Sequence, residues 1–249
     1  MLEQSTILDV NFCAIVELRQ YTLRPGMRDI LIELFDREFV ETQEALGMCI
    51  IGQFRDLDNP DRFIWLRGFP DMARRARALQ AFYSGPVWKA HREAANATMI
   101  DTDNVLLLRP ARANSAFQLD STLRPAPTMS NSSEGFVVPT IYYLNAPVGV
   151  AFVDFFEREL KPALTEVGAP ILAYFVTENS ANTFPALPVR EGEHVFVWFS
   201  AFANSAKYED FATAFAQRAD LAGELNSYLK RSPQVLKLSA AARSRLRGI

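Results

Sequence analysis

The 249-residue sequence contains few of the residues that build disulfide frameworks and metal sites. Its two cysteines are Cys13 and Cys49, its two histidines are His91 and His194, and neither a CxxC nor an HExxH motif occurs. Two cysteines are too few for a disulfide framework, and ligands scattered in this way do not match the spacing of common metal sites. We therefore expect reduced thiols and neither a metal nor another cofactor.

Charge and hydropathy exclude two further classes of partner. The net charge is -3 at pH 7, which is not the basic balance of a general nucleic-acid-binding protein. No apolar run approaches the ~18 residues that a membrane-spanning helix requires, and the first residues lack the basic and apolar regions of a signal peptide. We expect a cytoplasmic protein that binds neither nucleic acid nor membranes.

The motifs of several enzyme classes are absent as well. The sequence has no GxSxG, no GxxxxGK[ST] and no GxGxxG, so neither a nucleophile elbow nor the usual phosphate-binding loops are predicted. Two arginine clusters are present, and we interpret both as solvated helical surface. They are Arg74, Arg75 and Arg77, and Arg243, Arg245 and Arg247.

Apolar residues make up 49% of the chain, enough to bury the core of one large domain or of two domains of about 100 residues each. The stretch VELRQYTLRPGMRD alternates in its first half, so Val16 and Leu18 share one face of a strand. The opposite face presents Glu17, Arg19 and Tyr21. We expect the apolar pair to face covering helices, and the polar three to point beyond the opposite face of the sheet.

The rest of the first half predicts a β-α-β-β-α-β order. A helical pattern follows the first strand, and two β-rich runs at residues 48–54 and 63–69 flank a cluster of turn formers. Asp71 occupies an N-cap position before the next helix, because its carboxylate can accept the free backbone N–H groups of the first turn. A short strand at 105–109 completes the ferredoxin-like split unit, an α+β fold.

A second, degenerate copy of this unit follows the first. We assign residues 1–111 to a first ferredoxin-like domain, 112–134 to a linker, and 135–249 to the second copy. LFDREF at 34–39 is echoed by FFEREL at 155–160. The second copy also carries an insertion, NSANTFPALPVREGE, between its middle strands.

Comparison of the two copies separates the residues that maintain the fold from the polar residues that could carry chemistry. Framework residues persist in these pairs: Gly26 and Gly149, Gly47 and Gly168, Phe54 and Phe175, Trp65 and Trp198. Polar positions change: Glu17 becomes Thr140, Arg19 becomes Tyr142, Tyr21 becomes Leu144, Arg67 becomes Ser200, Trp88 becomes Leu221 and His91 becomes Glu224. We therefore expect any chemistry in the first half.

Several runs resemble the NIPSNAP family: VELRQYTLRPG, GQF, DRFIWLRGFPDMARRARAL, FYSGPVWKAHREAAN and VLLLRPA, in this order between residues 14 and 111. The resemblance implies a dimeric α/β-barrel of the ferredoxin-like superfamily, with two antiparallel sheets face to face, and it implies no defined biochemical role. The two halves could close such a barrel within one chain, or each could pair with a second chain in a homo-oligomer. We favour closure within the chain, because linked halves have a high effective concentration.

The polar face of the first strand is the sharpest candidate site. Glu17, Arg19 and Tyr21 alternate at a spacing of about 6.5 to 7 Å. Neighbouring positions on the paired central strand are Trp65, Arg67 and Phe69. Arginines bind planar anions and aromatic rings supply apolar area, so this surface suits a small aromatic or carboxylate-bearing ligand. In this hypothesis Arg19 or Arg67 anchors the anionic group. Glu17 is then the candidate general base, and Tyr21 donates a hydrogen bond.

Other interpretations of these residues stay open. Glu17 and Arg19 could form a structural ion pair, with Tyr21 satisfying spare lone pairs. Trp88 and His91 lie three positions apart, hence on one side of a helix. Trp88 is a candidate ligand-binding residue. His91 is a candidate acid or base, or an axial haem ligand, although a capping or interface histidine is the simpler interpretation.

Two functions are consistent with these patterns. The first is binding of a small aromatic or anionic metabolite in the barrel cavity of the first half, in its stronger form as a cofactor-independent enzyme. The alternative is a non-enzymatic interaction or scaffold protein with a filled barrel. Its cavities would fall below the ~300 Å³ of ordinary ligand pockets.

Overall fold

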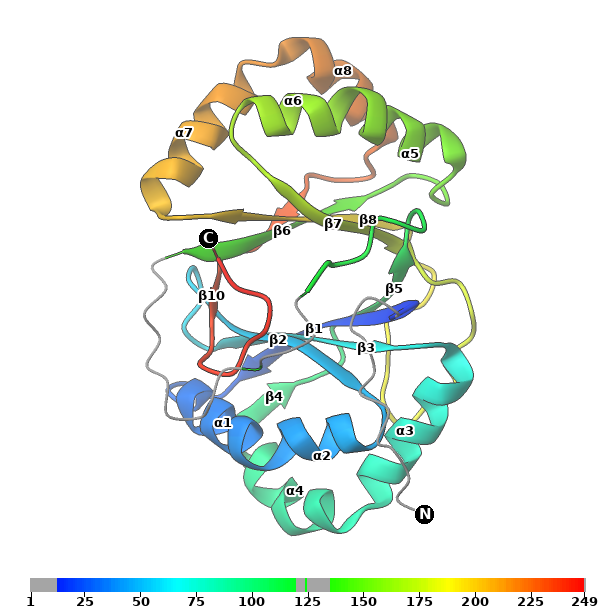
Figure 1. The fold of residues 1–249 in the computed structure, drawn as a ribbon, viewed down its shortest axis with the longest axis vertical. Coiled ribbons are helices and arrows are strands. Elements are labelled where there is room, and N and C mark those ends of the chain that lie inside the picture. The colour runs from blue at the N-terminus through cyan, green and yellow to red at the C-terminus, as the bar shows by residue number, and fades with distance from the viewer. Residues whose placement is uncertain (1–12, 120–123, 125–134, 249) are drawn as a thin grey trace.

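The computed structural model describes residues 13–119, 124 and 135–248, and they form a β-barrel with a layer of helices on two sides (Figure 1). The strands are β1 (Ile15–Leu23), β2 (Cys49–Asp56), β3 (Arg62–Phe69), β4 (Met99–Asp101), β5 (Val105–Pro110), β6 (Phe136–Tyr143), β7 (Ile171–Thr177), β8 (Val195–Phe202), β9 (Gln234–Val235) and β10 (Leu238–Ala240). The helices are α1 (Arg28–Leu34), η2 (Phe35–Phe39), α2 (Val40–Ala45), α3 (Met72–Ser84), α4 (Pro86–Thr98), α5 (Val150–Phe155), η3 (Phe156–Leu160), α6 (Lys161–Glu166), α7 (Ser205–Ala216) and α8 (Ala219–Tyr228).

Local sequence signals account for the ends of several elements. Gly26 adopts a φ of 77° in the turn between β1 and α1, a conformation that favours glycine. Asp71 caps α3 as predicted, because its carboxylate accepts a hydrogen bond from the backbone N–H of Arg74 at 2.6 Å. In the second half the Asn204 side chain caps α7 in the same way, accepting from the N–H of Lys207 at 3.0 Å.

The echoed motifs LFDREF and FFEREL form the same local structure. In each half an α-helix widens into one π-helical segment, η2 or η3, and then continues as an α-helix. Such π-bulges are uncommon in helices and cluster at functional sites. Each one begins with a buried phenylalanine, Phe35 or Phe156, which packs against the sheet beneath it.

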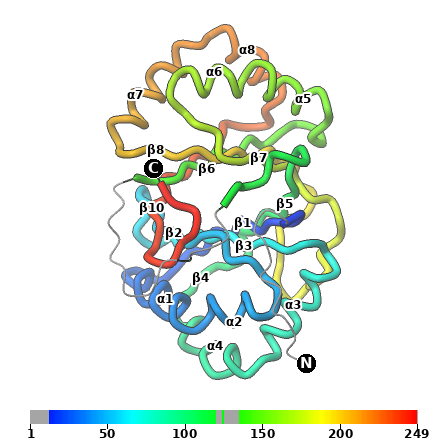
Figure 2. Tube along the Cα trace, viewed as in Figure 1, coloured from blue at the N-terminus to red at the C-terminus, as the bar shows by residue number. Residues whose placement is uncertain are grey.

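Eight antiparallel strands close the barrel in the order β10-β2-β3-β1-β5-β7-β8-β6, and β6 pairs with β10 in turn. One seam between the halves is the β5–β7 pair, where Leu108 lies opposite Thr177. At the other seam, Leu238 of β10 lies opposite both Asp56 of β2 and Val137 of β6. Figure 2 shows this C-terminal segment passing between the two sheets. The barrel therefore closes within one chain.

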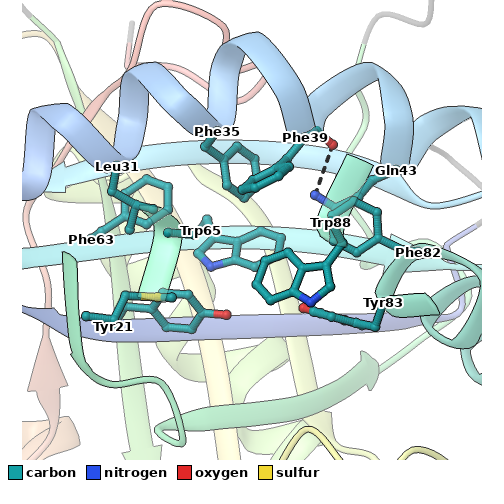
Figure 3. Close-up of a pocket in the computed structure, with 12 residues that line it drawn as sticks. Tyr21, Leu31, Phe35, Phe39, Gln43, Phe63, Trp65, Phe82, Tyr83 and Trp88 are labelled. Carbon is teal, nitrogen blue, oxygen red and sulfur yellow. Dashed lines mark hydrogen bonds between the residues drawn. The ribbon is translucent and has the colours of Figure 1, made fainter. Parts of the chain in front are cut away.

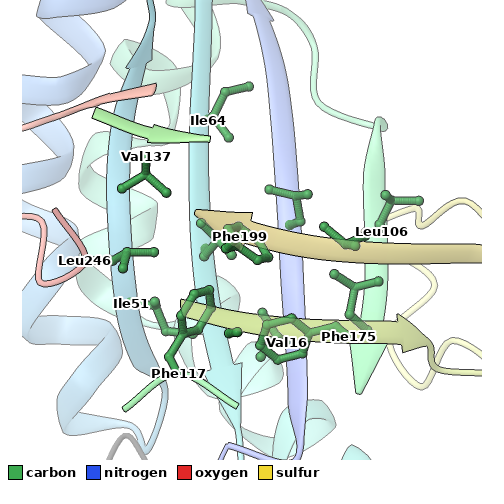
Figure 4. Close-up of a cluster of buried hydrophobic side chains, with 14 of the residues drawn as sticks. Val16, Ile51, Ile64, Leu106, Phe117, Val137, Phe175, Phe199 and Leu246 are labelled. Atoms are coloured by element: carbon green, nitrogen blue, oxygen red, sulfur yellow. The ribbon is translucent and has the colours of Figure 1, made fainter. Parts of the chain in front are cut away.

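Hydrophobic side chains fill the barrel interior (Figure 4). Val16 and Leu18 point into it, and Phe175 and Phe199 meet them from the opposite sheet. Phe117, from the beginning of the predicted linker, packs its ring 5.1 Å from Phe175 and 4.8 Å from Phe199. The expectation of a ligand cavity inside the barrel is therefore wrong, because the apolar faces of both sheets meet there. Of the predicted linker, residues 120–123 and 125–134 lie outside the described part of the chain.

The C-terminal arginine cluster at residues 243–247 is not a solvated helix end. The segment folds as turns and packs against the barrel core through Leu246. Arg243 is almost completely buried and forms an ion pair with Glu41. Leu246 belongs to the barrel core, and its N–H donates to the carbonyl of Ile51 at 3.0 Å. The cluster was misread because its apolar and small neighbours, which anchor it, follow no helical or strand period.

Helices cover the outer face of each sheet. The helices α1 to α4 pack on the sheet of the first half, and α5 to α8 pack on that of the second half (Figure 1). Among the described residues, no helix combines the length and apolar character that crossing a membrane would require. The molecule thus has three buried layers, one inside the barrel and one beneath each set of helices.

Candidate functional site

The polar face of β1 lies against the helices rather than inside the barrel. The register of β1 and β3 sets three pairs side by side: Glu17 with Arg67, Arg19 with Trp65, and Tyr21 with Phe63. The predicted orientation of β1 is thus reversed: Val16 and Leu18 point into the barrel instead of toward the helices. Both faces of this sheet are buried, so alternation alone could not tell which one meets the helices. The helices supply the polar partners Gln43 and Arg75, which the apolar barrel core could not provide.

Glu17 lies at the centre of three buried arginines. Its Oε2 accepts hydrogen bonds from Arg19 Nη1 and Arg67 Nε, both at 2.7 Å, and its Oε1 accepts one from Arg75 Nε at 2.7 Å. All four side chains are closed to solvent. Burial alone would raise the pKa of Glu17, but the guanidinium groups of Arg67, Arg19 and Arg75 outweigh it and hold that pKa well below its ordinary value. Glu17 is therefore an ionised anchor and a poor general base.

Arg75 corrects the interpretation of the first arginine cluster. Arg74 and Arg77 are exposed, as predicted, whereas Arg75 is completely buried. It lies four positions before Leu79 and seven before Phe82, both buried, and therefore on the stripe of α3 that faces the sheet. That spacing was the sequence signal by which Arg75 could have been found.

Positive charge exceeds negative charge in this cluster. Among the residues that the structure describes, three guanidinium groups surround one carboxylate, which leaves two of these positive charges without a counter-charge. The other partners are neutral: the Tyr21 hydroxyl for Arg19, the Gln43 amide for Arg67, and the Asn182 amide for Arg75. On each arginine, Nη2 is buried and has no hydrogen-bond partner among the described residues. An unbalanced buried charge is costly, so this cluster favours a nearby anion.

An aromatic cavity of about 40 Å³ adjoins the cluster (Figure 3). Three of its lining residues connect it to the arginines. Tyr21 and Gln43 bond to them directly, and the ring of Trp65 lies 4.9 Å from the guanidinium carbon of Arg67 and 5.5 Å from that of Arg19. The remaining aromatic wall consists of Phe35, Phe39, Phe63, Phe82, Tyr83 and Trp88.

A second cavity of about 250 Å³ extends from the first one toward the surface. Both are lined by Tyr21, Tyr83, Trp88 and Met99. The outer cavity adds Ile100, whose side chain is 62% exposed, and so opens to solvent. We call the two the inner cavity and the outer cleft.

The insertion in the second half, residues 179–193, forms part of this site. Figure 1 shows it, in yellow-green to yellow, descending from the second half to the helices of the first. Asn182 accepts a hydrogen bond from Arg75 Nη1 at 3.0 Å, and Phe184 stacks on Tyr83 with ring centroids 5.8 Å apart. Its Leu187 lines the outer cleft. The insertion is visible in the sequence, but its position could not be predicted, because nothing local indicates contacts with α3.

The second half fills the corresponding layer with larger side chains. Alignment of the echoed motifs sets Phe152 at the position of Leu31, and Tyr228 at the position of Ala95. Leu31 and Ala95 line the inner cavity. The rings of Phe152 and Tyr228 instead pack against each other at 5.1 Å, within the apolar layer under α5 to α8.

The other predicted site residues fall in different places. Trp65 and Trp88 line the inner cavity. Phe69 is buried at the far side of the arginine cluster, where the guanidinium carbon of Arg67 lies 5.5 Å from its ring centroid. Phe69 is therefore a packing partner of the cluster and does not line either cavity.

His91 stands apart from the cluster. Its Nε2 lies 3.4 Å from Glu38 Oε2, and its ring makes an edge contact with Phe39. It does not line the inner cavity or the outer cleft, so roles as acid, base or haem ligand find no geometric support there. Within the part of the chain that the structure describes, no three or more Cys, His, Asp or Glu side chains are grouped to hold a metal ion.

Comparisons with known proteins agree with the fold. The family model described as NIPSNAP matches residues 16–113. Two solved structures match nearly the full chain, each named a putative monooxygenase. The one from Fusobacterium nucleatum subsp. nucleatum has 9% identity and a TM-score of 0.56 over 94% of this chain and 95% of that chain. The one from Lactobacillus acidophilus has 14% identity and a TM-score of 0.52 over 93% and 97%.

A NIPSNAP-like domain protein from Burkholderia xenovorans is 28% identical over a shorter region. The match covers 39% of this chain and 84% of that chain, with a TM-score of 0.36. No curated protein matches the sequence.

Proposed function

Because residues 16–113 form a NIPSNAP domain, we propose that this domain binds a small aromatic metabolite between its sheet and its helices. One observation carries the proposal: an aromatic inner cavity continues into an outer cleft that opens to solvent. The ring of the ligand lies in the outer cleft, beside Tyr83, Trp88 and Met99. A substituent of the ring reaches the inner cavity.

The volumes limit the size of the ligand. The outer cleft holds about 250 Å³ and the inner cavity about 40 Å³. Pockets for drug-sized ligands begin at about 300 Å³, so a single ring system with small substituents is the expected class. The inner cavity is large enough for a polar substituent, because a water molecule needs only about 10 to 15 Å³ of such space.

Two full-length structural neighbours carry the name monooxygenase, and they support an enzymatic version of this proposal at the level of fold. In such an enzyme Glu17 is not the base, because three arginines bind both of its carboxylate oxygens and leave it with little affinity for a proton. Tyr21 is the better candidate for contact with a ligand, since it lines both cavities.

Tryptophan fluorescence tests the proposal. Trp65 and Trp88 line the inner cavity, so monocyclic aromatic compounds that bind should change the emission. The double variant Leu31→Phe with Ala95→Tyr copies the side chains of the second half into the cavity. We expect it to lose the response while keeping the circular dichroism spectrum of the parent.

Trp198 provides the matched control, because it lies in the apolar layer of the second half. The variant Trp198→Phe should keep the ligand response, since both reporters at the cavity remain. A response that survives filling of the cavity, or that disappears with Trp198, would place the ligand elsewhere and contradict the proposal.

A non-enzymatic interaction protein is the second candidate. The filled barrel interior favours it, and both cavities fall under the ~300 Å³ expected of ordinary ligand pockets. This candidate predicts that no monocyclic aromatic compound changes the tryptophan emission of the parent protein. The same titration therefore decides between the two.

A further inference from the structure

The described residues that line the two cavities offer hydrogen-bond donors and include no Asp or Glu. Trp65 Nε1–H is buried and has no hydrogen-bond partner among the described residues, although Trp65 lines the inner cavity. The Gln43 amide is already used on both sides, because its oxygen accepts from Arg67 and its nitrogen donates to the carbonyl of Phe39.

Tyr21 is held so that its hydroxyl donates toward the cavities. Its oxygen accepts a hydrogen bond from Arg19 Nε at 2.9 Å. A phenol has a single O–H donor, and with one lone pair bound to Arg19 its proton points away from the guanidinium group. Figure 3 shows the Tyr21 hydroxyl directed along the cavity toward Tyr83 and Trp88. Burial raises the pKa of Tyr21, although Arg19 lowers it in part, so the phenol remains a donor at neutral pH.

The arginine cluster makes this donor unusually favourable for an anion. Arg19 polarises the Tyr21 hydroxyl directly, and the guanidinium groups of Arg19 and Arg67 lie over Trp65, whose buried N–H has no partner among the described residues. The cluster holds two more positive charges than negative ones, and all of them are closed to solvent. In an interior of low dielectric such charges act strongly on a neighbouring group.

We propose that the inner cavity selects the anionic form of its ligand, and holds one negatively charged oxygen beside the Tyr21 hydroxyl and the Trp65 N–H. This inference rests on the proposed function and adds the chemistry of the ligand: a small aromatic ring bearing a phenolate or a carboxylate. The ring lies in the outer cleft, and the bound oxygen balances one of the two surplus positive charges of Arg19, Arg67 and Arg75.

Two pairs of probes test the charge preference on the unmodified protein. The pairs are 4-nitrophenol with nitrobenzene, and benzoate with benzamide. The two members of each pair have similar shape, but only one of them ionises. Calorimetric titrations above and below the ordinary pKa of 4-nitrophenol give the affinities of its two forms. We expect the anion to bind about tenfold or more tightly than its neutral partner, with a fall of about one unit in the pKa of bound 4-nitrophenol, read from its visible absorbance.

A preference shown only by the 4-nitrophenol pair indicates a phenolate ligand, and a preference shown only by the benzoate pair indicates a carboxylate. Equal binding of anion and neutral partner in both pairs would overturn the inference and leave the proposed function standing. Failure of all four probes to bind would instead reject the proposed function, and the inference with it.

The variant Tyr21→Phe tests whether the anionic oxygen binds beside the Tyr21 hydroxyl. We expect it to reduce the advantage of the anion about tenfold while nitrobenzene binds as before, since the ring of the side chain is kept. The control is Tyr142→Phe, which removes a buried phenol from the second half. An anion preference that Tyr21→Phe leaves unchanged would show that the oxygen does not lie beside Tyr21. If Tyr21→Phe fails to fold, the comparison of probes on the unmodified protein still decides.

Discussion

Glu17 and Arg75 are 58 positions apart in the chain, and Arg75 Nε donates to Glu17 Oε1 at 2.7 Å in a space closed to solvent. The contact joins the first strand to α3 through the interior. It belongs to a cluster in which one carboxylate neutralises part of the charge of three arginines. The negative charge of Glu17 is therefore the one whose loss should affect the fold most.

The variant Glu17→Gln should destabilise the protein strongly. Removing one partner of a buried ion pair typically costs about 3 to 5 kcal/mol, and here it leaves three arginines without a counter-charge. The free energy of unfolding from urea titration measures this effect. The exposed pair of Asp29 with Arg55 provides the control, because Asp29→Asn should cost about 1 kcal/mol or less. A fully stable Glu17→Gln protein without activity would instead favour a catalytic Glu17.

The carboxyl group of Asp36 should make the free energy of unfolding depend on pH. Burial raises its pKa to about 6, although Arg243, Arg124 and Arg55 lower it in part. A carboxyl whose pKa is higher in the folded state binds more protons when folded, so stability should fall as pH rises from about 4 to about 6. The variant Asp36→Asn should flatten this slope. Unfolding free energies measured across that pH range test it, and an unchanged slope would contradict the assignment.

Glu17 acts in the opposite direction. Its pKa is lowered in the folded state, so its contribution is present above the ordinary pKa of a glutamate, about 4.3, and is lost only as pH falls toward the lower folded value. The unfolding free energy should therefore fall less between pH 6 and pH values below 4 in Glu17→Gln than it does in the parent protein.

Gly26 and Gly149 are equivalent in the two halves but differ in conformation. Gly26 has a φ of 77°, whereas Gly149 has a φ of -93°. A Cβ atom would meet nothing within 4 Å at either position, so steric contact does not decide the outcome. We expect Gly26→Ala to cost about 1 to 2 kcal/mol, because its backbone is left-handed. Gly149 is the N-cap of α5, where glycine is preferred to alanine, and this preference offsets the lower chain entropy of alanine. Gly149→Ala should therefore change stability by less than about 1 kcal/mol. Thermal unfolding of both variants makes the comparison, and equal effects would argue against the turn at Gly26.

Phe184 should shield the outer cleft. Its ring stacks on Tyr83, which lines the cleft together with Trp88. Trp65 and Trp198 are buried, so acrylamide quenching reports mainly on the half-buried Trp88. We expect Phe184→Ala to increase the quenching of Trp88 fluorescence.

The matched control for Phe184 is Phe215, another half-buried ring that stacks on a neighbour, Phe211, in the second half. Phe215→Ala should leave the quenching unchanged. Equal quenching in both variants would mean that the insertion does not cover the cleft.

Local patterns in the sequence predicted the elements of the first half and the Asp71 cap, because helix period, strand alternation and capping depend on neighbouring residues. The inward face of β1 was predicted wrongly. Its two faces are equally buried, and the choice between them depends on Gln43 and Arg75, which lie on other elements. The position of Asn182 against Arg75 depends on contacts between residues 107 positions apart, which no local pattern records.

The single-chain barrel has a consequence for stoichiometry. A barrel made from two copies of one chain would repeat every residue, and would therefore carry two equivalent sites. Here the linked halves differ: one keeps a cavity beside Leu31 and Ala95, while the other fills that place with Phe152 and Tyr228 and lends its insertion to its neighbour. Each barrel should accordingly saturate with one ligand molecule, half as many as a symmetric barrel of the same architecture would bind.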